Sequence, residues 1–558
     1  MELALNPLMT GPQGRIAGGG FVTHLASEGI IVTGAPVDGS EEILTPPALR
    51  FVADLHRCFE DRRRELLTRR AQVQASFEAG GRPSFADQTR PIRAGSWMTP
   101  PPPPGLNARR VECVGSVDRE SLMAGLYSRA DVYVADLDGA TSPTWESLLL
   151  GQRHLRDAVR GMIAYQAPDG REVELAPVAA ALMLQPRGLH LVESRVSVDD
   201  EPVSAGLFDL GLFLFHNAEH LHQHRCGPFV SLGGVEGQLE AQWWHEVLLS
   251  AESILGLPEA SIRTSLVVDT ITGAFEVEEM LYELRERAAG LVCDRWNYVF
   301  SFVRAFGGRG GFLMPDTSLI TMERHFLEAA SMLVVQIGHR RGVPVIGVTS
   351  TQVPIPSDPI ADRVAMARLV ADKTREADGG FDGSRVGHPD FVRVAMGVFE
   401  SRWSGRRTPR GGMSYMRPRA KDLLTFPDGP VTEAGVRHCV RVALRYLEGW
   451  LRGVGCLPVR HDQTTLAMVE VARAQLWHWI RRQAQLDDGR TVTEKLYDAT
   501  VDYEIGSIRR ALGEEVWAMG EFDRARSLLD RLVLAPTLSA TVAQEGMGPL
   551  LERETSMR

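Results

Sequence analysis

Short apolar runs alternate with longer stretches of helical periodicity in the middle of the chain, and this alternation constrains the fold most. Eight runs have the length and apolar content of buried strands: 111–114, 132–137, 181–184, 229–232, 265–268, 290–293, 312–314 and 343–348. The segments between them repeat apolar residues at helical spacing and are long enough to connect parallel strands. We predict an α/β fold in which these strands form a (β/α)₈ TIM barrel. A doubly wound parallel sheet is the alternative that the same alternation allows.

The segments on either side of these runs have a different pattern. Before them, Thr45 is a suitable N-cap, and apolar residues recur at helical spacing over 48–70, which predicts a long helix. The proline run 100–104 is incompatible with a helix or a central strand and marks a boundary. Beyond the barrel segment only helical periodicity remains. We therefore predict three domains: an N-terminal extension over 1–104, the barrel over 105–400 and an all-helical domain over 401–558.

Composition narrows the choice of partners. The net charge is −10, from 61 basic and 71 acidic side chains, which argues against a general nucleic-acid binder. No apolar run approaches the ~20 residues of a membrane span, and the N-terminal segment lacks the basic-then-apolar order of a secretory signal. The six cysteines form no CxxC pair, which is typical of isolated thiols in a reducing compartment. We expect a cytoplasmic protein that acts on small molecules and has no nucleic-acid or membrane partner.

Polar residues follow most of the predicted strands at their carboxyl ends, the face on which barrel enzymes carry their active sites. They are Asp136, Asp138, Arg187, Glu236, Asp269, and the run Asp294-Arg295-Trp296-Asn297. Carboxylates that converge with one arginine suit a hard cation such as Mg²⁺ and an anionic oxygen substrate. Strand-end caps and salt bridges are the structural alternative for the same residues.

Three further motifs allow both a chemical and a structural interpretation. His216, His220 and His224 have i, i+4 spacing, which suits a zinc site or a solvated helix face. Cys456 suits a nucleophile or a buried thiol. The basic segment 402–419 suits a contact with a CoA phosphate or a solvated linker.

Many colinear motifs, spread from about residue 30 to residue 535, resemble those of malate synthase of the shorter, A-type form. They include Ile43-Leu-Thr-Pro46, Arg109-Arg-Val-Glu112, Ala140-Thr-Ser-Pro-Thr-Trp145, Pro186-Arg-Gly188, Phe215-His-Asn217, Phe381-Asp-Gly383, Thr432-Glu-Ala-Gly435 and Gln475-Leu-Trp477. The resemblance implies an N-terminal helical clasp, a TIM barrel and a C-terminal helical plug over the barrel. It also implies that Mg²⁺ holds glyoxylate, that an aspartate of the plug removes a proton from acetyl-CoA, and that an arginine stabilises the enolate. Arg187 matches the family arginine in its motif.

The rest of the site departs from the family pattern. Asp269 stands where the family has a metal-binding glutamate, and Asn297 stands where it has a metal-binding aspartate. Because an amide oxygen carries no charge, this pair predicts a weakened Mg²⁺ site. Asp138-Gly139 replaces a Glu-Asp pair, and Gly234 replaces a lysine.

The position of the catalytic base also differs. An ungapped alignment places the family's catalytic aspartate on Thr465, whose hydroxyl is a poor proton acceptor at neutral pH. Asp462 lies three residues earlier and would share a helix face with position 465 if a helix had already begun there.

We therefore expect an acyl-CoA-dependent acyltransferase that forms a carbon–carbon bond between an acyl-CoA and a 2-oxo acid such as glyoxylate, with an altered substrate or reaction. Decarboxylation of a malonyl-type thioester is one alteration that requires no base. A catalytically inactive homologue that serves as a binding or scaffolding protein is the alternative. A third hypothesis is ordinary malate synthase chemistry through Asp462. The sequence identifies no residues that bind the CoA moiety and gives no oligomeric state.

Overall fold

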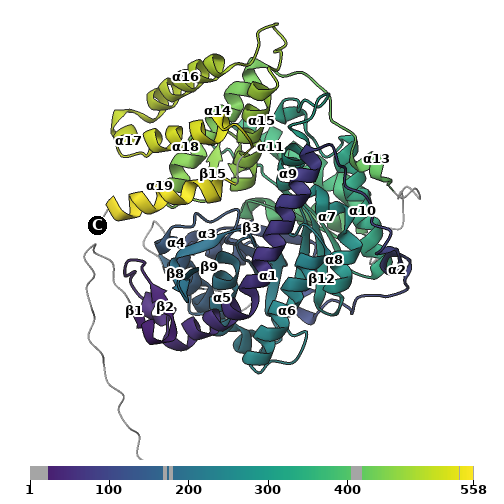
Figure 1. Cartoon of the computed structure of the whole chain (residues 1–558), viewed down its shortest axis with the longest axis vertical. Coiled ribbons are helices and arrows are strands. Elements are labelled where there is room, and N and C mark those ends of the chain that lie inside the picture. The colour runs from purple at the N-terminus through teal and green to yellow at the C-terminus, as the bar shows by residue number, and fades with distance from the viewer. Residues whose placement is uncertain (1–22, 167–171, 175–179, 404–417, 539–540, 557–558) are drawn as a thin grey trace, which may run out of the picture.

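A closed barrel of eight parallel strands forms the centre of the molecule (Figure 1). The computed structural model describes residues 23–166, 172–174, 180–403, 418–538 and 541–556. In chain order the barrel strands are β3 (Val111–Gly115), β4 (Val132–Asp136), β7 (Ala181–Gln185), β10 (Phe229–Leu232), β11 (Arg263–Val268), β12 (Ala288–Cys293), β13 (Val345–Ser350) and β14 (Gly383–Val386). The pairing of β7 with β10 and of β14 with β3 closes the barrel. The predicted TIM barrel is confirmed.

Seven of the eight predicted runs form barrel strands, and the prediction for 312–314 is wrong. The ring of Phe312 lies 5.0 Å from that of His478 and 4.7 Å from that of Phe426. The carbonyl of Met314 accepts a hydrogen bond from the indole N–H of Trp479 at 2.7 Å. This apolar run is buried against the C-terminal domain rather than within the sheet.

The eighth strand is β14, which the apolar pattern does not reveal. Its sequence Gly-Ser-Arg-Val contains two polar residues, and both have partners inside the protein. Ser384 donates to the carboxylate of Glu376, and Arg385 donates to that of Glu112 at 2.7 Å. Because these side chains are paired, the strand is buried without being apolar.

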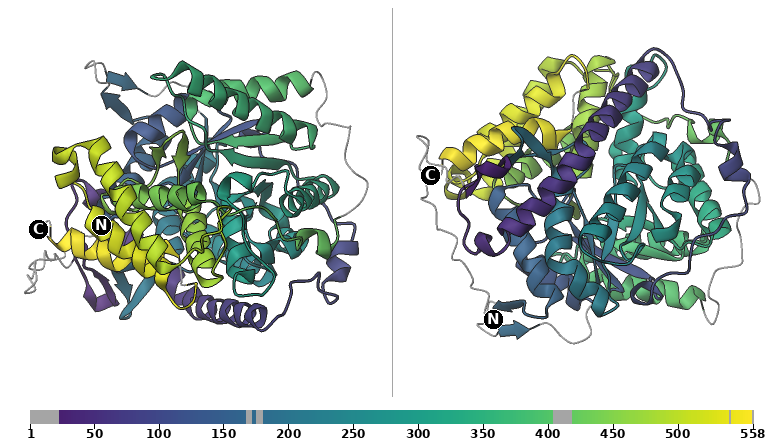
Figure 2. Two further views of the ribbon diagram at one scale, coloured as in Figure 1. Left: turned by 90° about the horizontal axis from the view of Figure 1, so that it is seen from above. Right: turned by 60° about the horizontal axis from the view of Figure 1, so that its bottom comes forward.

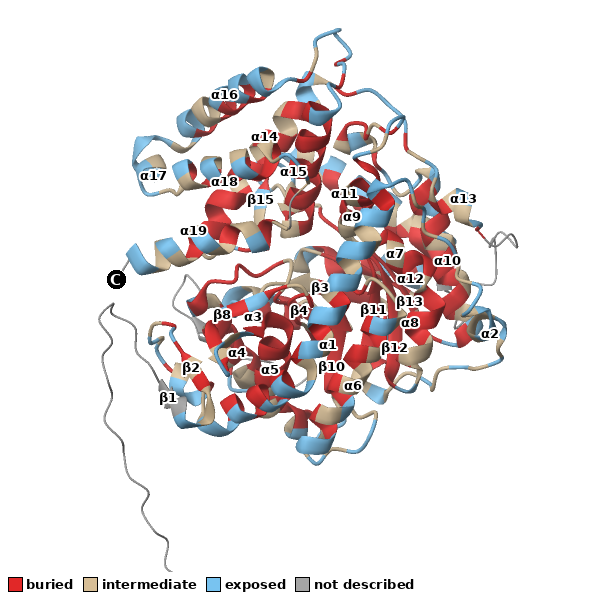
Figure 3. Cartoon of the chain, viewed as in Figure 1, coloured by how far each residue is buried: buried red, intermediate tan, exposed pale blue. Residues whose placement is uncertain are grey.

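A ring of helices covers the outside of the barrel, with buried faces toward the strands (Figure 3). These helices are α3 (Arg119–Tyr127), α4 (Trp145–Val159), α5 (Ala205–Gln223), α6 (Gln238–Ile254), α7 (Ile271–Phe275), α8 (Val277–Glu283), α9 (Trp296–Phe306), α10 (His325–Arg341), α11 (Pro359–Asp378) and α12 (Val392–Trp403). Within the described residues no helix is long and apolar enough to cross a membrane.

The N-terminal segment packs along the barrel as a long helix, α1 (Pro46–Glu78), which crosses α5, α6 and α9 (Figure 2). Thr45 caps it as predicted, since its hydroxyl accepts the N–H of Ala48 at 3.3 Å. The short helix α2 (Arg90–Ala94) follows.

Two small sheets lie outside the barrel. One has the order β1 (Thr23–Leu25), β2 (Ile30–Val32), β8 (Val192–Val198) and β9 (Glu201–Ser204). The other pairs β5 (Ala164–Gln166) with β6 (Glu172–Glu174).

The C-terminal domain lies against the carboxyl ends of the barrel strands (Figures 1 and 2). It is helical as predicted except for the hairpin β15 (Leu457–Val459) and β16 (Asp462–Thr464). The helices after the barrel are α13 (Ala420–Leu423), α14 (Glu433–Leu451), α15 (Leu466–Arg481), α16 (Glu494–Leu512), α17 (Glu514–Ala518), α18 (Phe522–Leu534) and α19 (Val542–Ser556). Two hydrogen bonds tie this domain to the loop after β4: Leu466 N–H to the Gly139 carbonyl at 3.1 Å, and Ser142 Oγ to the Trp450 carbonyl at 2.6 Å.

We predict that Gly455→Ala destabilises the protein by ~1–3 kcal/mol, because overpacking costs this much in a well-packed interior. A Cβ at Gly455 would lie 2.3 Å from backbone atoms of Thr141 and Ser142. Urea denaturation measures the change. Gly397→Ala is the control, since its Cβ would meet nothing within 4 Å on α12. Equal stability of the two variants would contradict close contact between the domains at Gly455.

Candidate active site at the barrel mouth

Two cavities lie where the barrel meets the C-terminal domain. The first, called the mouth cavity, has a volume of about 410 Å³ and is lined by strand-end residues together with residues of α1, α9 and α15. The second, called the side cavity, has a volume of about 560 Å³ and lies among β3, α3, α4 and the loop 453–456. The loop after β4 borders both, because Asp138 and Gly139 line the mouth cavity while Thr141 lines the side cavity.

Asp269 lines the mouth cavity with one carboxylate oxygen unsatisfied. Its Oδ2 accepts the N–H of Gly234 at 2.7 Å, whereas Oδ1 is buried without a hydrogen-bond partner among the described residues. Burial raises the pKa of Asp269 well above its ordinary value, and the charges of Asp294 and Asp138 raise it further. A cation at Oδ1 would relieve both the repulsion and the unmet hydrogen-bonding capacity.

The two aspartates after β4 have different surroundings. Asp136 Oδ1 accepts the N–H groups of Asp138 and Gly139, each at 2.9 Å, and the side-chain amide of Gln185 at 3.2 Å. Asp138 lines the mouth cavity, and its Oδ1 accepts the N–H of Gly188 at 3.0 Å. Burial, and then the neighbouring charge of Asp136, raise the pKa of Asp138 to about 7.

The run after β12 contributes one side chain to the mouth cavity, Asn297. The backbone N–H of Asn297 donates to Asp294 Oδ1 at 2.8 Å, so the Asp294 carboxylate caps the first turn of α9. Arg295 stacks over the ring of Trp296 at 3.8 Å, and neither residue is among those that line the mouth cavity. The predicted substrate-binding role of this pair therefore finds no support in the position of their side chains.

The structure corrects the expectation that Arg187 faces a substrate. Its Nε and Nη2 donate to Asp209 at 2.9 and 2.7 Å, and its Nη1 donates to Glu193 at 3.0 Å. The side chain is buried and does not line the mouth cavity. Two carboxylates bind the N–H groups along the edges of this guanidinium, so the side chain belongs to a buried ion-pair network rather than to the wall of the mouth cavity.

Thr465 and Asp462, the two candidates for the base, are separated by the start of α15. Thr465 is the residue before the helix, and its side chain makes no capping hydrogen bond. Asp462 belongs to β16, where its Oδ1 accepts the hydroxyl of Thr351 at 2.9 Å. The helix does not extend back to Asp462, so the premise that Asp462 shares a helix face with position 465 is wrong.

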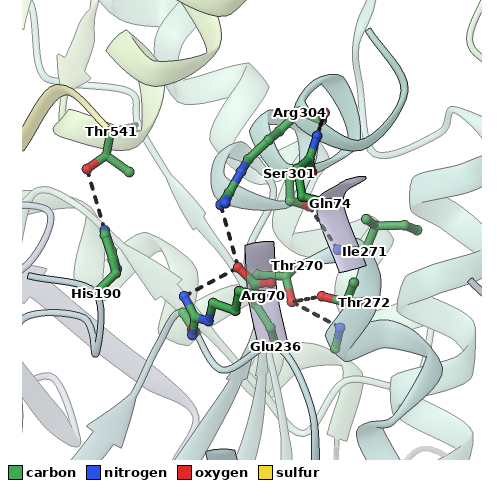
Figure 4. A network of polar contacts seen from close by, with 12 residues as sticks. Arg70, Gln74, His190, Glu236, Thr270, Ile271, Thr272, Ser301, Arg304 and Thr541 are labelled. Atoms are coloured by element: carbon green, nitrogen blue, oxygen red, sulfur yellow. Dashed lines mark hydrogen bonds and ion pairs between the residues drawn. The ribbon is translucent and has the colours of Figure 1, made fainter. Parts of the chain in front are cut away.

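Four titratable residues of the mouth cavity lie outside the predicted strand ends: Arg70 on α1, His190, Arg304 on α9 and Glu470 on α15. Figure 4 shows Arg70 and Arg304 on either side of Glu236, at 3.3 and 3.6 Å, which places the predicted Glu236 in an ion-pair network. Burial, together with the positive charges of Arg70 and Arg304, lowers the pKa of His190 to about 3. For the three residues on helices the sequence gives only a weak signal, a polar residue within an amphipathic helix, whereas His190 lies in the loop after β7.

The structure describes two of the three remaining motifs, Cys456 and the histidines of α5, and most of the basic segment lies outside the described residues. Cys456 is half-buried and lines the side cavity, so it is not the fully buried thiol of the structural interpretation. Its surroundings raise the pKa of the thiol to about 12, chiefly through loss of solvation, and Gln463 donates to its sulfur at 3.0 Å, which makes it a poor nucleophile at neutral pH. His216 Nε2 lies 2.8 Å from the Ile43 carbonyl. Most of the basic segment 402–419 falls on residues 404–417, outside the described residues.

The donors at the mouth are oxygens, which Mg²⁺ prefers, although they do not form a complete set of protein ligands. Among the described residues no three His, Cys, Asp or Glu side chains converge as metal ligands. Mg²⁺ commonly keeps several water ligands and is held by one or two carboxylates together with its substrate. The unsatisfied Oδ1 of Asp269 and the side-chain oxygen of Asn297 meet this lesser requirement.

Fold and cavity define a (β/α)₈-barrel protein with acidic residues in a cavity between the strand ends and the C-terminal helical domain, here called the helical cap. Family models match three segments: "Malate synthase, N-terminal domain" at 28–90, "Malate synthase, TIM barrel domain" at 181–426 and "Malate synthase, C-terminal" at 430–548. Malate synthase of Myxococcus xanthus is 40% identical over 91% of this chain and 94% of its own length. Malate synthase of Streptomyces clavuligerus is 39% identical over 90% and 95%. This chain belongs to the malate synthase family.

We predict that Arg187→Ala lowers the free energy of unfolding by ~3–5 kcal/mol, since it leaves Asp209 buried without its ion-pair partner and leaves Glu193 with Arg195 alone. Urea denaturation at pH 7.5 measures this loss. Arg50→Ala, which removes an exposed ion pair with Glu28, should cost no more than ~1 kcal/mol. An Arg187→Ala variant as stable as the unchanged protein would return this arginine to the list of candidate catalytic residues.

Proposed function

We propose that this protein is an acyl-CoA-dependent condensing enzyme of the malate synthase type, which joins an acyl-CoA to a 2-oxo acid such as glyoxylate. The observation that carries the proposal is the mouth cavity, where carboxylates with an unsatisfied oxygen lie at the strand ends beneath α15. The identity of 35–40% to curated malate synthases over nearly the whole chain supports this reaction class. The departures at 269, 297 and 465 support an altered substrate or reaction.

The oxo acid is proposed to bind in the mouth cavity. Arg70 and Arg304 supply positive charge on the wall formed by α1 and α9, and their shared partner Glu236 fixes their positions. Asp269 and Asn297 would hold Mg²⁺ in a weakened site, in which the ion would polarise the carbonyl of the oxo acid. The helical cap restricts access of water to this space.

The acyl-CoA is proposed to enter through the side cavity. The two cavities share the loop after β4 as a common wall, so a thioester carried along the side cavity arrives next to Asp138 and Gly139. Acidic residues of the side cavity, among them Asp118, Glu120 and Glu146, disfavour the CoA phosphates there. We therefore place the pantetheine arm in this cavity and the phosphates outside it.

A second candidate function is a non-catalytic family member that binds these ligands without turnover. Two observations favour it: Arg187 is engaged by carboxylates, and position 465 presents a hydroxyl in place of a carboxylate. Restoring both Thr465→Asp and Asp269→Glu distinguishes the candidates. If only the restored protein is active, the natural protein binds these ligands without turnover.

The proposed reaction releases free CoA from the acyl-CoA substrate. We expect release of free CoA thiol when the protein is mixed with an acyl-CoA and a 2-oxo acid, and more release with Mg²⁺ than with a chelator. A panel of acetyl-, propionyl- and malonyl-CoA against glyoxylate and larger oxo acids identifies the pair. Malonyl-CoA tests the decarboxylative route. No product with any combination would exclude the enzymatic function.

A second prediction concerns the side cavity. Ala124→Trp, on the rim of the side cavity, is expected to raise the acetyl-CoA dissociation constant by at least 10-fold, because it fills the space proposed for pantetheine. Isothermal titration calorimetry measures the change. Ala75→Trp, exposed on α1 and outside both cavities, is the control. Unchanged affinity in Ala124→Trp would place the CoA elsewhere.

A third prediction concerns Mg²⁺ and pH. Because burial raises the pKa of Asp269, its contribution to stability falls as pH rises from its ordinary range near 4 through the folded-state pKa. Asp269→Asn should therefore raise the melting temperature at pH 8 in chelator and abolish the stabilisation that Mg²⁺ gives the unchanged protein. Thermal melts at pH 5 and pH 8 test both effects. Undiminished Mg²⁺ stabilisation in Asp269→Asn would contradict its role as a ligand.

A further inference from the structure

A condensation that starts from acetyl-CoA needs a group that removes a proton from the acyl carbon. Thr465 cannot serve at neutral pH, and Asp462 is engaged with Thr351 on β16. The proton acceptor must therefore come from another side chain of the mouth cavity. The acidic side chains that line this cavity are Asp138, Glu236, Asp269 and Glu470. His190 also lines it, but a pKa of about 3, lowered chiefly by burial, makes this imidazole a weak base.

Three of these four side chains have other partners or another role. Glu236 forms ion pairs with Arg70 and Arg304. Glu470 pairs with Arg473 and accepts the N–H of Val542. Asp269 is the proposed cation ligand, which leaves Asp138.

The residue after Asp138 contacts the residue after Thr465, the position at which the family has its catalytic aspartate. The carbonyl of the following residue, Gly139, accepts the N–H of Leu466, the residue after Thr465, at 3.1 Å. This hydrogen bond brings the loop after β4 against the start of α15. A carboxylate on the loop after β4 can therefore reach much of the space that a carboxylate at the start of α15 would reach.

The loop holds the Asp138 side chain in a fixed orientation. Oδ1 accepts the N–H of Gly188, while the Asp138 N–H is itself bound by Asp136. Neither hydrogen bond occupies Oδ2, and the residue lines the mouth cavity. A carboxylate that lines a cavity and is held through one oxygen, with the other not used by these hydrogen bonds, is suited to act as a general base.

We infer that Asp138 is the catalytic base of this protein, a function transferred from the helical cap to the barrel loop after β4. The inference rests on the proposed condensing function. It assigns the proton-transfer step to a residue for which the family pattern provides no such role.

The step balances without a further reagent. Asp138 takes a proton from the α-carbon of the acyl group, and the C–H electron pair becomes the enolate. The enolate carbon bonds to the carbonyl carbon of the oxo acid, whose oxygen becomes an alkoxide and recovers the proton from Asp138. Water then cleaves the thioester and releases the CoA thiol and a hydroxy acid.

The charged groups around Asp138 set its protonation. Asp136 on β4, Asp209 on α5 and Asp269 after β11 oppose its ionisation, and Arg187 after β7 favours it. From the cap and α1, Glu470 and Arg70 line the same cavity. A carboxyl with a pKa near 7 is an effective base at neutral pH, because it combines basicity with partial ionisation.

The test measures exchange of the acetyl-CoA methyl protons with D₂O, together with product formation, in the full-length protein. Asp138→Asn is expected to slow both by about 10²–10⁴-fold, while the acetyl-CoA dissociation constant changes by less than about 3-fold. Asp138→Glu should retain more activity than Asp138→Asn. The rate of the unchanged protein should rise with pH, reach half its maximum near pH 7 and level off above about pH 8, since the ionised carboxylate is the base.

Adding Thr465→Asp to the Asp138→Asn variant should raise its rate at least 10-fold, because the second change places a carboxylate at the start of α15. Asp462→Asn is the matched control and should change the exchange rate by less than about 3-fold. Exchange by Asp138→Asn at the rate of the unchanged protein would overturn the assignment and leave the proposed function standing. Absence of both exchange and product in the unchanged protein would overturn the proposed function and this inference with it.

Discussion

The contact between the loop after β4 and the helical cap is the constraint on which the rest of the site depends. Gly455 approaches the backbone at Thr141 and Ser142 so closely that no side chain fits, and Leu466 donates to the Gly139 carbonyl. The mouth cavity on one side and the side cavity on the other exist because this contact closes the space between two domains. It also places the loop that carries Asp138 against the start of α15, where Thr465 precedes the helix.

Most of the fold follows from the apolar pattern, and the exceptions have physical causes. Runs with alternating helices predict seven barrel strands, and Thr45 predicts the start of α1. The strand β14 escapes prediction because Ser384 and Arg385 are buried through hydrogen bonds rather than through apolar contact. Residues 312–314 mislead for the converse reason, since their apolar side chains pack against α15 and not against a neighbouring strand.

The site is less predictable than the fold because position in a motif does not specify a side chain's partners. The strand-end rule correctly brings Asp138, Glu236, Asp269 and Asn297 to one cavity. It fails for Arg187, whose partners Glu193 and Asp209 are invisible to a rule that considers each strand end separately. It also misses Arg70, because a residue on a helix that precedes the barrel gives no sign that it reaches the strand ends. Ion pairs between distant segments decide which charges a ligand meets.

The carboxylate of Glu554 on α19 accepts the backbone N–H of Trp145 at 2.8 Å, across 409 positions of sequence, and also pairs with Arg195. The opening turn of α4 thus obtains a hydrogen-bond acceptor from a helix that the ribosome makes several hundred residues later. Before α19 is made, the N–H of Trp145 can bond only to water. The last helix of the described chain therefore supplies a hydrogen bond to an early helix of the barrel, which joins the two ends of the fold.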